Sequence, residues 1–203
     1  IIYNGKCVYN SPCFFERLGH ILYKVDGTSF FQVNADISEK IKTDITSYFN
    51  KNDIVYDFYC GVGYFSLHLT HKTKQVIGIE ANQKAILNAI YNASLNQIEN
   101  TSFHVGKVED LIVKIPVKAN KAIVDPPRSG LHKKVRDVFL SRDFETIIYI
   151  SCNPKTLVRD LKELTKKYKI EKLTAYDMFP YTKHIECVCI LKNRKKRDSY
   201  DKV

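Results

Sequence analysis

The stretch that decides the fold reads Ile148-Tyr149-Ile150-Ser151-Cys152-Asn153-Pro154. Its apolar, β-branched run predicts a strand that ends just before Cys152. Pro154 opens a helical stretch, where the missing N–H of proline costs nothing because the first turn of a helix has no internal partner for it. A strand, a side chain able to act as a nucleophile and a helix start follow one another. In α/β enzymes this order presents a reactive group at the carboxyl edge of a sheet.

Strands and helices alternate on both sides of this stretch. Apolar runs predict parallel strands at 54–59, 75–80, 101–105, 121–124 and 146–151. Helical patterns predict helices at 64–71, 81–96, 107–114, through Val135 and Phe139, and at 154–168. Two further strands at 172–179 and 185–191 are joined by so short a link that they must form an antiparallel hairpin. The whole predicts a doubly wound α/β sheet resembling that of class I methyltransferases, whereas a nicotinamide-binding domain would usually close with a sixth parallel strand.

The chain divides into three parts. Residues 1–33 read as β-structure and as the remnant of a larger upstream region, residues 34–191 as the α/β domain, and residues 192–203 as a basic tail. Asn34 is expected to cap the first helix, which places Ile37, Ile41 and Ile45 on one apolar face. Because the chain begins with Ile1 rather than Met, we expect it to be part of a longer protein.

Composition limits the function classes. The 203 residues are 44% apolar and 27% charged, as in ordinary globular proteins. No apolar run is long enough to span a membrane, and no secretory signal opens the chain. The net charge of +10 favours a polyanionic partner, because lysine and arginine release the counterions that condense on nucleic acids. A lysine-rich proteome would give the same excess. The sequence does not fix the oligomeric state, and we expect a monomer.

The six cysteines, at positions 7, 13, 60, 152, 187 and 189, show no spacing typical of a zinc site, so we expect no metal. Cys60, Cys187 and Cys189 lie in apolar strand contexts and are expected to be inert core thiols. Free cysteines without a secretory signal indicate a reducing cytoplasm.

A glycine turn follows the first parallel strand, in the sequence Asp57-Phe58-Tyr59-Cys60-Gly61-Val62-Gly63-Tyr64. The glycines let the backbone approach a ligand at the N-terminus of the next helix. Ser66 stands where a dinucleotide-binding motif has its third glycine, and a turn without any ligand would look similar. Glu80 ends the second strand, 19 residues after Gly61. A carboxylate there can bind both ribose hydroxyls of an adenosyl ligand, and we favour this over an unengaged strand-end acid.

Asp125-Pro126-Pro127-Arg128 ends the fourth strand, where two prolines stiffen the loop that holds Asp125 at the sheet edge. Enzymes that methylate exocyclic amines also carry an acid followed by prolines, usually with an aromatic residue next. Arg128 suits a phosphate or a base edge better. A rigid turn without function is the alternative.

Cys152 is a candidate nucleophile, because the helix that begins at Pro154 can lower the pKa of a thiol. A small buried cysteine is the alternative. His184 and Glu186 lie two apart on the last strand and share a face. That antiparallel strand starts at the edge where the parallel strands end, so Glu186 can lie near Cys152. Its apolar neighbours would raise the pKa of Glu186 toward that of a useful base, unless it is merely a salt-bridged acid.

As a set, these motifs resemble those of the bacterial RNA uracil-5 methyltransferases, which make 5-methyluridine in tRNA or large-subunit rRNA. The resemblance runs from about Ser29 to Leu191 and rests on residues 30–34, 57–63, 78–80, 125–131, 151–154 and 184–187. It implies S-adenosyl-L-methionine as methyl donor and RNA as partner, with 23S rRNA preferred and tRNA as the alternative.

The resemblance also implies roles. Cys152 would add to C6 of uracil, C5 would take the methyl group, and Glu186 would remove the C5 proton before elimination frees the thiol. C5 is a poor nucleophile until C6 is saturated, which explains the need for a thiol. The residues implied to bind the donor are Gln32, Tyr59, Gly61, Tyr64, Glu80 and Asp125. Many members carry asparagine at the position of Tyr64, so we expect that contact to differ here.

Three alternatives stay open. Cytosine-5 RNA methyltransferases normally carry a cysteine in the fourth-strand motif, where this chain has Pro127 and Arg128. An amino-group methyltransferase needs no thiol, and a non-catalytic RNA-binding module could keep a vestigial site. The family's RNA-binding barrel and iron–sulfur cysteines have no counterpart in this sequence, since Cys7 and Cys13 alone cannot hold a cluster. We therefore expect these residues to bind donor yet methylate RNA poorly.

Overall fold

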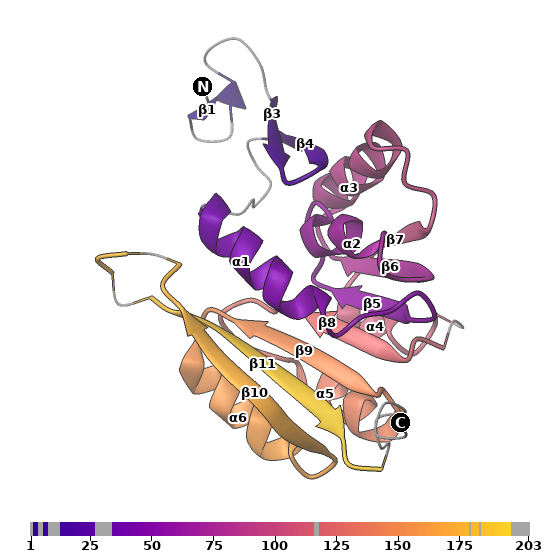
Figure 1. Cartoon of the computed structure of the whole chain (residues 1–203), viewed down its shortest axis with the longest axis vertical. Coiled ribbons are helices and arrows are strands. Elements are labelled where there is room, and N and C mark those ends of the chain that lie inside the picture. The colour runs from indigo at the N-terminus through magenta and orange to yellow at the C-terminus, as the bar shows by residue number, and fades with distance from the viewer. Residues whose placement is uncertain are drawn as a thin grey trace.

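A computed structural model of the chain describes residues 2–3, 6–7, 13–26, 34–115, 118–178, 180–182 and 184–195. Seven strands form its central sheet: β5 (Ile54–Phe58), β6 (Gln75–Glu80), β7 (Thr101–Val105), β8 (Lys121–Val124), β9 (Thr146–Ser151), β10 (Tyr168–Tyr176) and β11 (Glu186–Asn193). Their order across the sheet is β10-β11-β9-β8-β5-β6-β7 (Figure 1). β11 runs antiparallel to both of its neighbours, and the other neighbouring pairs are parallel.

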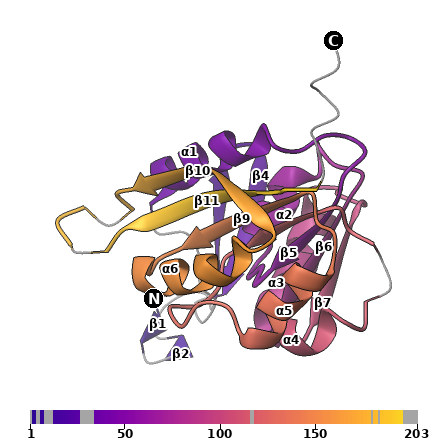
Figure 2. The ribbon, with the colours of Figure 1, turned by 90° about the horizontal axis from the view of Figure 1, so that it is seen from below.

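Helices cover both faces of the sheet. On one face lie α1 (Ala35–Thr46), α2 (Tyr64–Leu69) and α3 (Gln83–Leu95), and on the other α4 (Val108–Leu111), α5 (Lys133–Ser141) and α6 (Pro154–Leu164). Figure 2 shows α1 and α6 on opposite sides of β11. In β9, Ile148 and Ile150 point into the first core, whereas Ile147 and Tyr149 point into the second. A strand buried on both faces is apolar throughout, and the predicted doubly wound sheet with a C-terminal hairpin is confirmed.

The helix after Cys152 is shorter than the sequence predicts. α6 ends at Leu164, and Tyr168, expected as its last residue, instead begins β10. The Tyr168 side chain is buried, and its hydroxyl donates a hydrogen bond to the Phe139 carbonyl at 2.8 Å, which holds the chain against α5. Tyr168 then pairs with Asn193, so the final strand also runs two residues further than expected.

A hairpin and two short strands precede the sheet. β1 (Ile2–Tyr3) pairs with β2 (Lys6–Cys7), and β3 (Cys13–Leu18) pairs with β4 (Ile21–Asp26) through a turn at Gly19, whose φ is +56°. Tyr23 and Val25 of β4 are buried in the core that α1, α2 and α3 share. The Asn34 side chain caps α1 as predicted, accepting a hydrogen bond from the Ile37 N–H at 3.2 Å.

Two side-chain amides, those of Asn92 in α3 and of Asn96 directly after it, complete the outer edge of β4. Asn92 accepts the N–H of Lys24 at 2.7 Å and donates to its carbonyl at 3.1 Å. Asn96 makes the same pair of bonds with Leu22, at 2.9 and 2.8 Å. Asn92 and Asn96 are separated by a helical rise of about 6.0 Å, and Leu22 and Lys24 by a strand rise of about 6.7 Å. Because these spacings are similar, both amides can reach the strand at once. These four bonds fix the hairpin to the domain.

No helix among the described residues is long and apolar enough to cross a membrane.

Candidate active site

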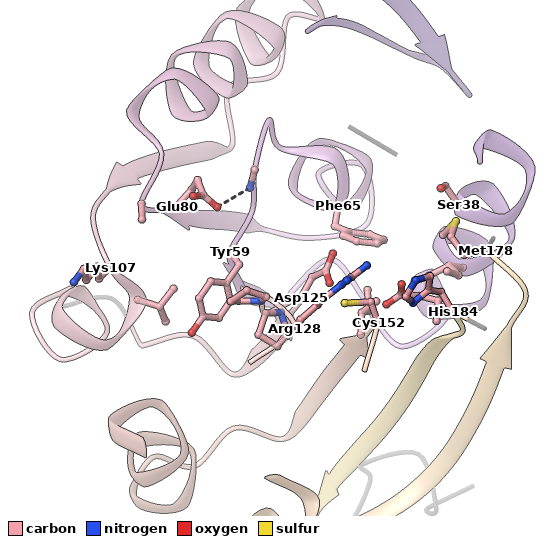
Figure 3. A pocket seen from close by; sticks show the side chains of 18 of the residues that line it. Ser38, Tyr59, Phe65, Glu80, Lys107, Asp125, Arg128, Cys152, Met178 and His184 are labelled. Atoms are coloured by element: carbon pink, nitrogen blue, oxygen red, sulfur yellow. Dashed lines mark hydrogen bonds between the residues drawn. The ribbon is translucent and has the colours of Figure 1, made fainter. Parts of the chain in front are cut away.

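A cavity of about 670 Å³ opens at the carboxyl edge of the parallel strands, where β11 begins (Figure 3). Six of the eight residues to which the resemblance assigns a role line it: Tyr59, Gly61, Glu80, Asp125, Cys152 and Glu186. Tyr64 does not. Its ring lies in the core, with centroids 5.0 Å from those of Phe65 and His68, and Phe65 lines the cavity in its place. Gln32 lies outside the described residues.

One end of the cavity is built by the glycine turn and Glu80. The two Glu80 oxygens accept the N–H groups of Gly61 at 3.4 Å and Asn82 at 2.8 Å, which fixes the carboxylate. Gly61 has a φ of +53°, and a Cβ built there would meet no atom within 4 Å. Its backbone therefore faces open space in the cavity. Tyr59 also has a positive φ, of 64°, an unusual conformation for a side chain of its size that clusters at functional sites.

Ser66 has a structural role beneath this turn. Its hydroxyl donates a hydrogen bond of 2.6 Å to the fully buried Asp57. Burial raises the pKa of Asp57 to about 7, while the bond from Ser66 acts to lower it. The residue in the third glycine position thus serves to satisfy a buried carboxyl below the glycine turn.

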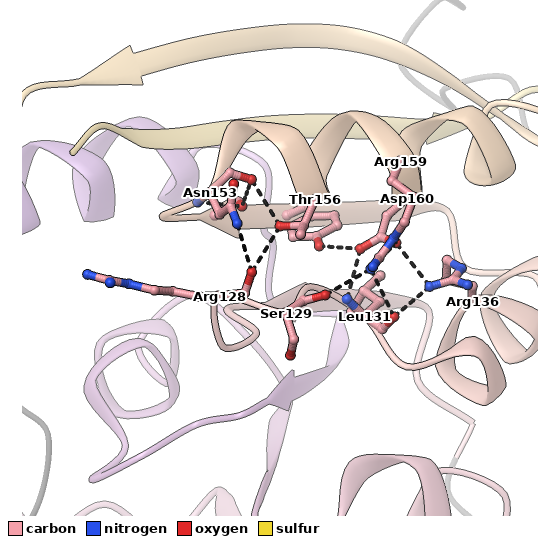
Figure 4. A network of polar contacts seen from close by, with 10 residues as sticks. Arg128, Ser129, Leu131, Arg136, Asn153, Thr156, Arg159 and Asp160 are labelled. Carbon is pink, nitrogen blue, oxygen red and sulfur yellow. Dashed lines mark hydrogen bonds and ion pairs between the residues drawn. The ribbon is translucent and has the colours of Figure 1, made fainter. Parts of the chain in front are cut away.

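The loop that carries Asp125 and Arg128 is fixed from behind by Asp160 (Figure 4). Asp160 is fully buried and accepts hydrogen bonds from the Tyr149 hydroxyl at 2.7 Å and the Leu131 N–H at 2.8 Å. It also pairs with Arg136 and Arg159. A buried carboxylate needs such a full set of partners to repay its desolvation.

Two further bonds hold the loop to the start of α6. The Arg128 carbonyl accepts hydrogen bonds from Asn153 at 2.9 Å and Thr156 at 3.3 Å. The Arg128 side chain is exposed and lines the cavity. Burial, followed by the charges of Glu186 and Asp57, holds the pKa of Asp125 well above its usual range.

The other end of the cavity brings Cys152 and Glu186 together. In the β9–β11 pair, Cys187 lies opposite Ser151 and Val188 opposite Ile150, so the next position of the same register sets Glu186 opposite Cys152. Glu186 is 7% exposed, and its Oε1 is among the buried polar atoms of the described residues that have no hydrogen-bond partner. Burial raises the pKa of Glu186 to about 7. A carboxyl in this state can gain and lose a proton near neutral pH.

The expectation that α6 lowers the pKa of Cys152 is wrong for the ligand-free cavity. Burial raises the pKa of the thiol, and the charges of Glu186 and Asp125 raise it further, while Arg128 acts in the opposite direction. Burial is the largest of these effects, and the two carboxyls that share the pocket with the thiol add to it.

Sequence reasoning missed the wall that closes the cavity. Ser38 and Ile41 of α1, Phe65 of α2 and Met178 after β10 all line it. The apolar face of α1 was visible in the sequence, but no motif shows that part of this face covers a cavity rather than the core.

No three His, Cys, Asp or Glu side chains in the described part of the chain lie together in a way that could hold a metal ion. The ionisable groups that line this edge of the cavity include the Cys152 thiol, the carboxyls of Asp125 and Glu186, the guanidinium of Arg128 and the imidazole of His184.

Solved structures share this architecture. Over 90% of this chain and 45% of the other, the fold matches the Pyrococcus abyssi tRNA (uracil-54, C5)-methyltransferase in complex with S-adenosyl-L-homocysteine, with a TM-score of 0.80 and 32% identity. Trm5b from Pyrococcus abyssi, at 19% identity and a TM-score of 0.74 over 91% of this chain and 56% of that one, shares the fold alone. The sheet and its glycine turn define the class of Rossmann-like S-adenosylmethionine-dependent methyltransferases.

Sequence comparison narrows the class to a family. A family model described as tRNA (uracil-5-)-methyltransferase matches residues 17–194, and the chain belongs to this family. A protein named as an RNA methyltransferase in Leptospira interrogans is 39% identical over 176 residues, which are 86% of this chain and 45% of the relative. One from Clostridium tetani is 38% identical over 190 residues, 92% of this chain and 42% of that protein. The chain spans less than half the length of these relatives.

Proposed function

We propose that this chain is the catalytic part of an S-adenosylmethionine-dependent RNA uracil-5 methyltransferase that forms a covalent bond between Cys152 and C6 of a uridine. The observation that carries the proposal is a single cavity with Cys152 and Glu186 at one end and Gly61 and Glu80 at the other. A thiol and a carboxyl are the two groups that this chemistry needs. The thiol makes C5 nucleophilic, and the carboxyl removes its proton.

The residues near β6 fit an adenosyl ligand. Glu80 is fixed by two N–H groups and keeps lone pairs for two ribose hydroxyls. Gly61 leaves its backbone open to the ligand, and Tyr59 and Asp125 line the same space. From β6 to β11 the cavity crosses four strand spacings, roughly 19 Å, which accommodates an adenosyl group beside a base. The donor supplies an electrophilic methyl group. A role for Gln32 stays a prediction.

The protein groups act in sequence on the base. The Cys152 thiolate adds to C6, and the electron pair of the C5–C6 double bond becomes an enolate that is nucleophilic at C5. After C5 has gained the methyl group, the Glu186 carboxylate removes the C5 proton. The electron pair of that C–H bond restores the double bond and expels the thiolate. Arg128, which favours the charged form of the thiol, supports the first step.

We propose that the substrate is RNA and that the protein works in the cytoplasm. The net charge of +10 and the exposed Arg128 beside the cavity suit a phosphate backbone. The target uridine must leave its stack to reach Cys152. From the sequence we prefer 23S rRNA, while the name of the Pyrococcus abyssi relative points to tRNA. Mass mapping of 5-methyluridine in both RNAs, from cells with and without the gene, decides between them.

The decisive variant is Cys152→Ala. We expect it to abolish methyl transfer while calorimetry shows donor affinity unchanged within about twofold, because the thiol follows β9, three strands from the Glu80 end of β6. Cys13→Ala, on the hairpin, is the matched control and should keep activity. Undiminished methylation by Cys152→Ala would contradict the covalent route and favour an amino-group methyltransferase. A wild-type chain that binds no donor would favour a non-catalytic RNA-binding module.

A further inference from the structure

Glu186 needs a way to return its proton to water. In the proposed function each turnover replaces a hydrogen at C5 by a methyl group, so one proton leaves per cycle. Glu186 receives it, yet the side chain is 7% exposed and its Oε1 has no partner among the described residues. A Glu186 that stays protonated cannot serve as the base in the next cycle. A group between Glu186 and water would remove this obstacle.

Most neighbours of Glu186 cannot fill this role. Tyr59, Glu80 and Lys107 also line the cavity, but Figure 3 shows them on the side away from Cys152, and Glu109 lies on α4 beside β6. Besides His184, the polar residues that remain in the cavity or pair with Glu186 are Ser38, Asp125, Arg128, Cys152 and Tyr176.

The hydroxyls of Ser38 and Tyr176 already donate, to the Asn34 carbonyl at 2.7 Å and to Asp44 at 2.5 Å. Cys152 is engaged with the base during the reaction. Arg128 holds its protons too tightly to pass them on. Asp125 is a half-buried carboxyl whose pKa is held above its usual range, so it competes for the same proton.

His184 remains, and its position fits. It comes two residues before Glu186, lines the same cavity and is partly exposed, whereas Glu186 is buried. Figure 3 shows it at the Cys152 end of the cavity, away from Glu80. Its backbone N–H donates to the Thr182 hydroxyl at 3.2 Å, which steadies the turn that presents the ring. Imidazole has two nitrogens that can accept a proton on one side and release one on the other near neutral pH.

We propose that His184 carries the proton between the Glu186 carboxyl and water. The Glu186 carboxyl gives its proton to one nitrogen of the neutral imidazole, and the imidazolium releases the proton of its other nitrogen to water. His184 is thus a positioning residue that serves the reaction through Glu186 and makes no bond to the base. This inference rests on the proposed function.

The transfer of the proton from Glu186 to water can be measured without any methyl donor. In uridine RNA carrying tritium at C5, addition of Cys152 to C6 lets C5 take a proton from water on the face that the methyl group would otherwise occupy, which turns the tritium toward Glu186. The Glu186 carboxylate then removes the tritium, and elimination returns intact uridine. Tritium appears in water only if the Glu186 carboxyl exchanges with solvent before the tritium goes back to C5. Tritium release therefore measures the step assigned to His184.

Covalent trapping isolates the earlier steps. With donor and RNA containing 5-fluorouridine, addition and methyl transfer leave a C5 without a removable proton, so the protein stays bound to RNA. His184→Gln should slow tritium release by about tenfold or more, the lower range for an acid–base group, and keep the trapping rate within about twofold. Imidazole in the buffer should restore part of the release. His184→Asn is a second variant, and His104→Gln, partly exposed on β7, is the matched control that should change neither readout.

Three outcomes would overturn the inference. Unchanged tritium release by both His184 variants would show that the proton leaves by another way. Loss of trapping together with release would show that His184 shapes the cavity instead. A wild-type chain that gives neither trapping nor release would overturn the proposed function, and this inference with it.

Discussion

Replacing Glu186 by glutamine should stabilise the protein at neutral and alkaline pH. Burial raises the pKa of Glu186 from its ordinary 4.5 to about 7. Because the folded protein binds this proton more tightly than the unfolded chain, the stabilisation linked to it is complete below pH 4.5. It is lost as the pH rises through 7. The loss is about 1.36 kcal/mol for each pH unit, or about 3 kcal/mol in all, and Glu186→Gln would not suffer it.

The assay is urea unfolding of both proteins at intervals between pH 4.5 and 8.5. The glutamine amide also lacks a partner at Oε1, which adds a constant to the difference in free energy of unfolding between the two proteins. The test is therefore how this difference changes with pH. We expect the free energy of unfolding of the variant, relative to the wild type, to grow by about 3 kcal/mol up to pH 7–8 and then level off.

Two controls sharpen this result. Glu171→Gln lies on an exposed position of β10, where the carboxylate stays in water in both states, so its difference should change little with pH. Repeating the pair in an Asp125→Asn background separates the coupling between these carboxyls, since Glu186 contributes to the raised pKa of Asp125. A flat difference for Glu186→Gln in both backgrounds would refute the claim that burial raises the pKa of the Glu186 carboxyl to about 7.

Three further changes test other parts of the structure. Gly61→Ala should weaken the binding of S-adenosylhomocysteine, measured by calorimetry, by about tenfold, because its Cβ would enter the cavity. The control Gly19→Ala, at a residue with a similar φ of +56°, should cost about 1–2 kcal/mol of stability and leave the affinity unchanged. Asp160→Ala should cost about 3–5 kcal/mol in urea unfolding, because two arginines and a tyrosine hydroxyl lose their partner; a loss under 1 kcal/mol would contradict this. Burial lowers the pKa of His68 to about 3. The free energy of unfolding should therefore fall by about 1.4 kcal/mol for each pH unit below pH 6.5, because the unfolded chain takes up a proton that the folded protein does not. The variant His68→Leu should abolish this slope.

Much of the fold could be read from the sequence because its strands are buried on both faces. β6, β8 and β9 have the predicted bounds, since an apolar run between turns leaves little choice of register. β7, which is partly exposed at the sheet edge, also has the predicted bounds. The end of α6 could not be read, because the residues after Leu164 keep a helical pattern. What ends the helix is the long-range bond from Tyr168 to the Phe139 carbonyl.

The candidate site was predictable as far as it lies at strand ends. Tyr59, Glu80, Asp125 and Cys152 follow or end parallel strands, and such positions meet at one edge of the sheet. The orientation of Tyr64 was not predictable, because its place in the core depends on the hairpin, where Tyr23 packs at a centroid distance of 6.1 Å.

The amides of Asn92 and Asn96, at the end of α3, have a consequence for how the molecule behaves in a crowded solution. An open strand edge recruits foreign strands and seeds aggregates. The side chains of Asn92 and Asn96 bind the backbone N–H and carbonyl groups of Leu22 and Lys24. These amides therefore make the hydrogen bonds that a further strand would otherwise make with β4. Along these two residues the hairpin offers no template to a stray chain.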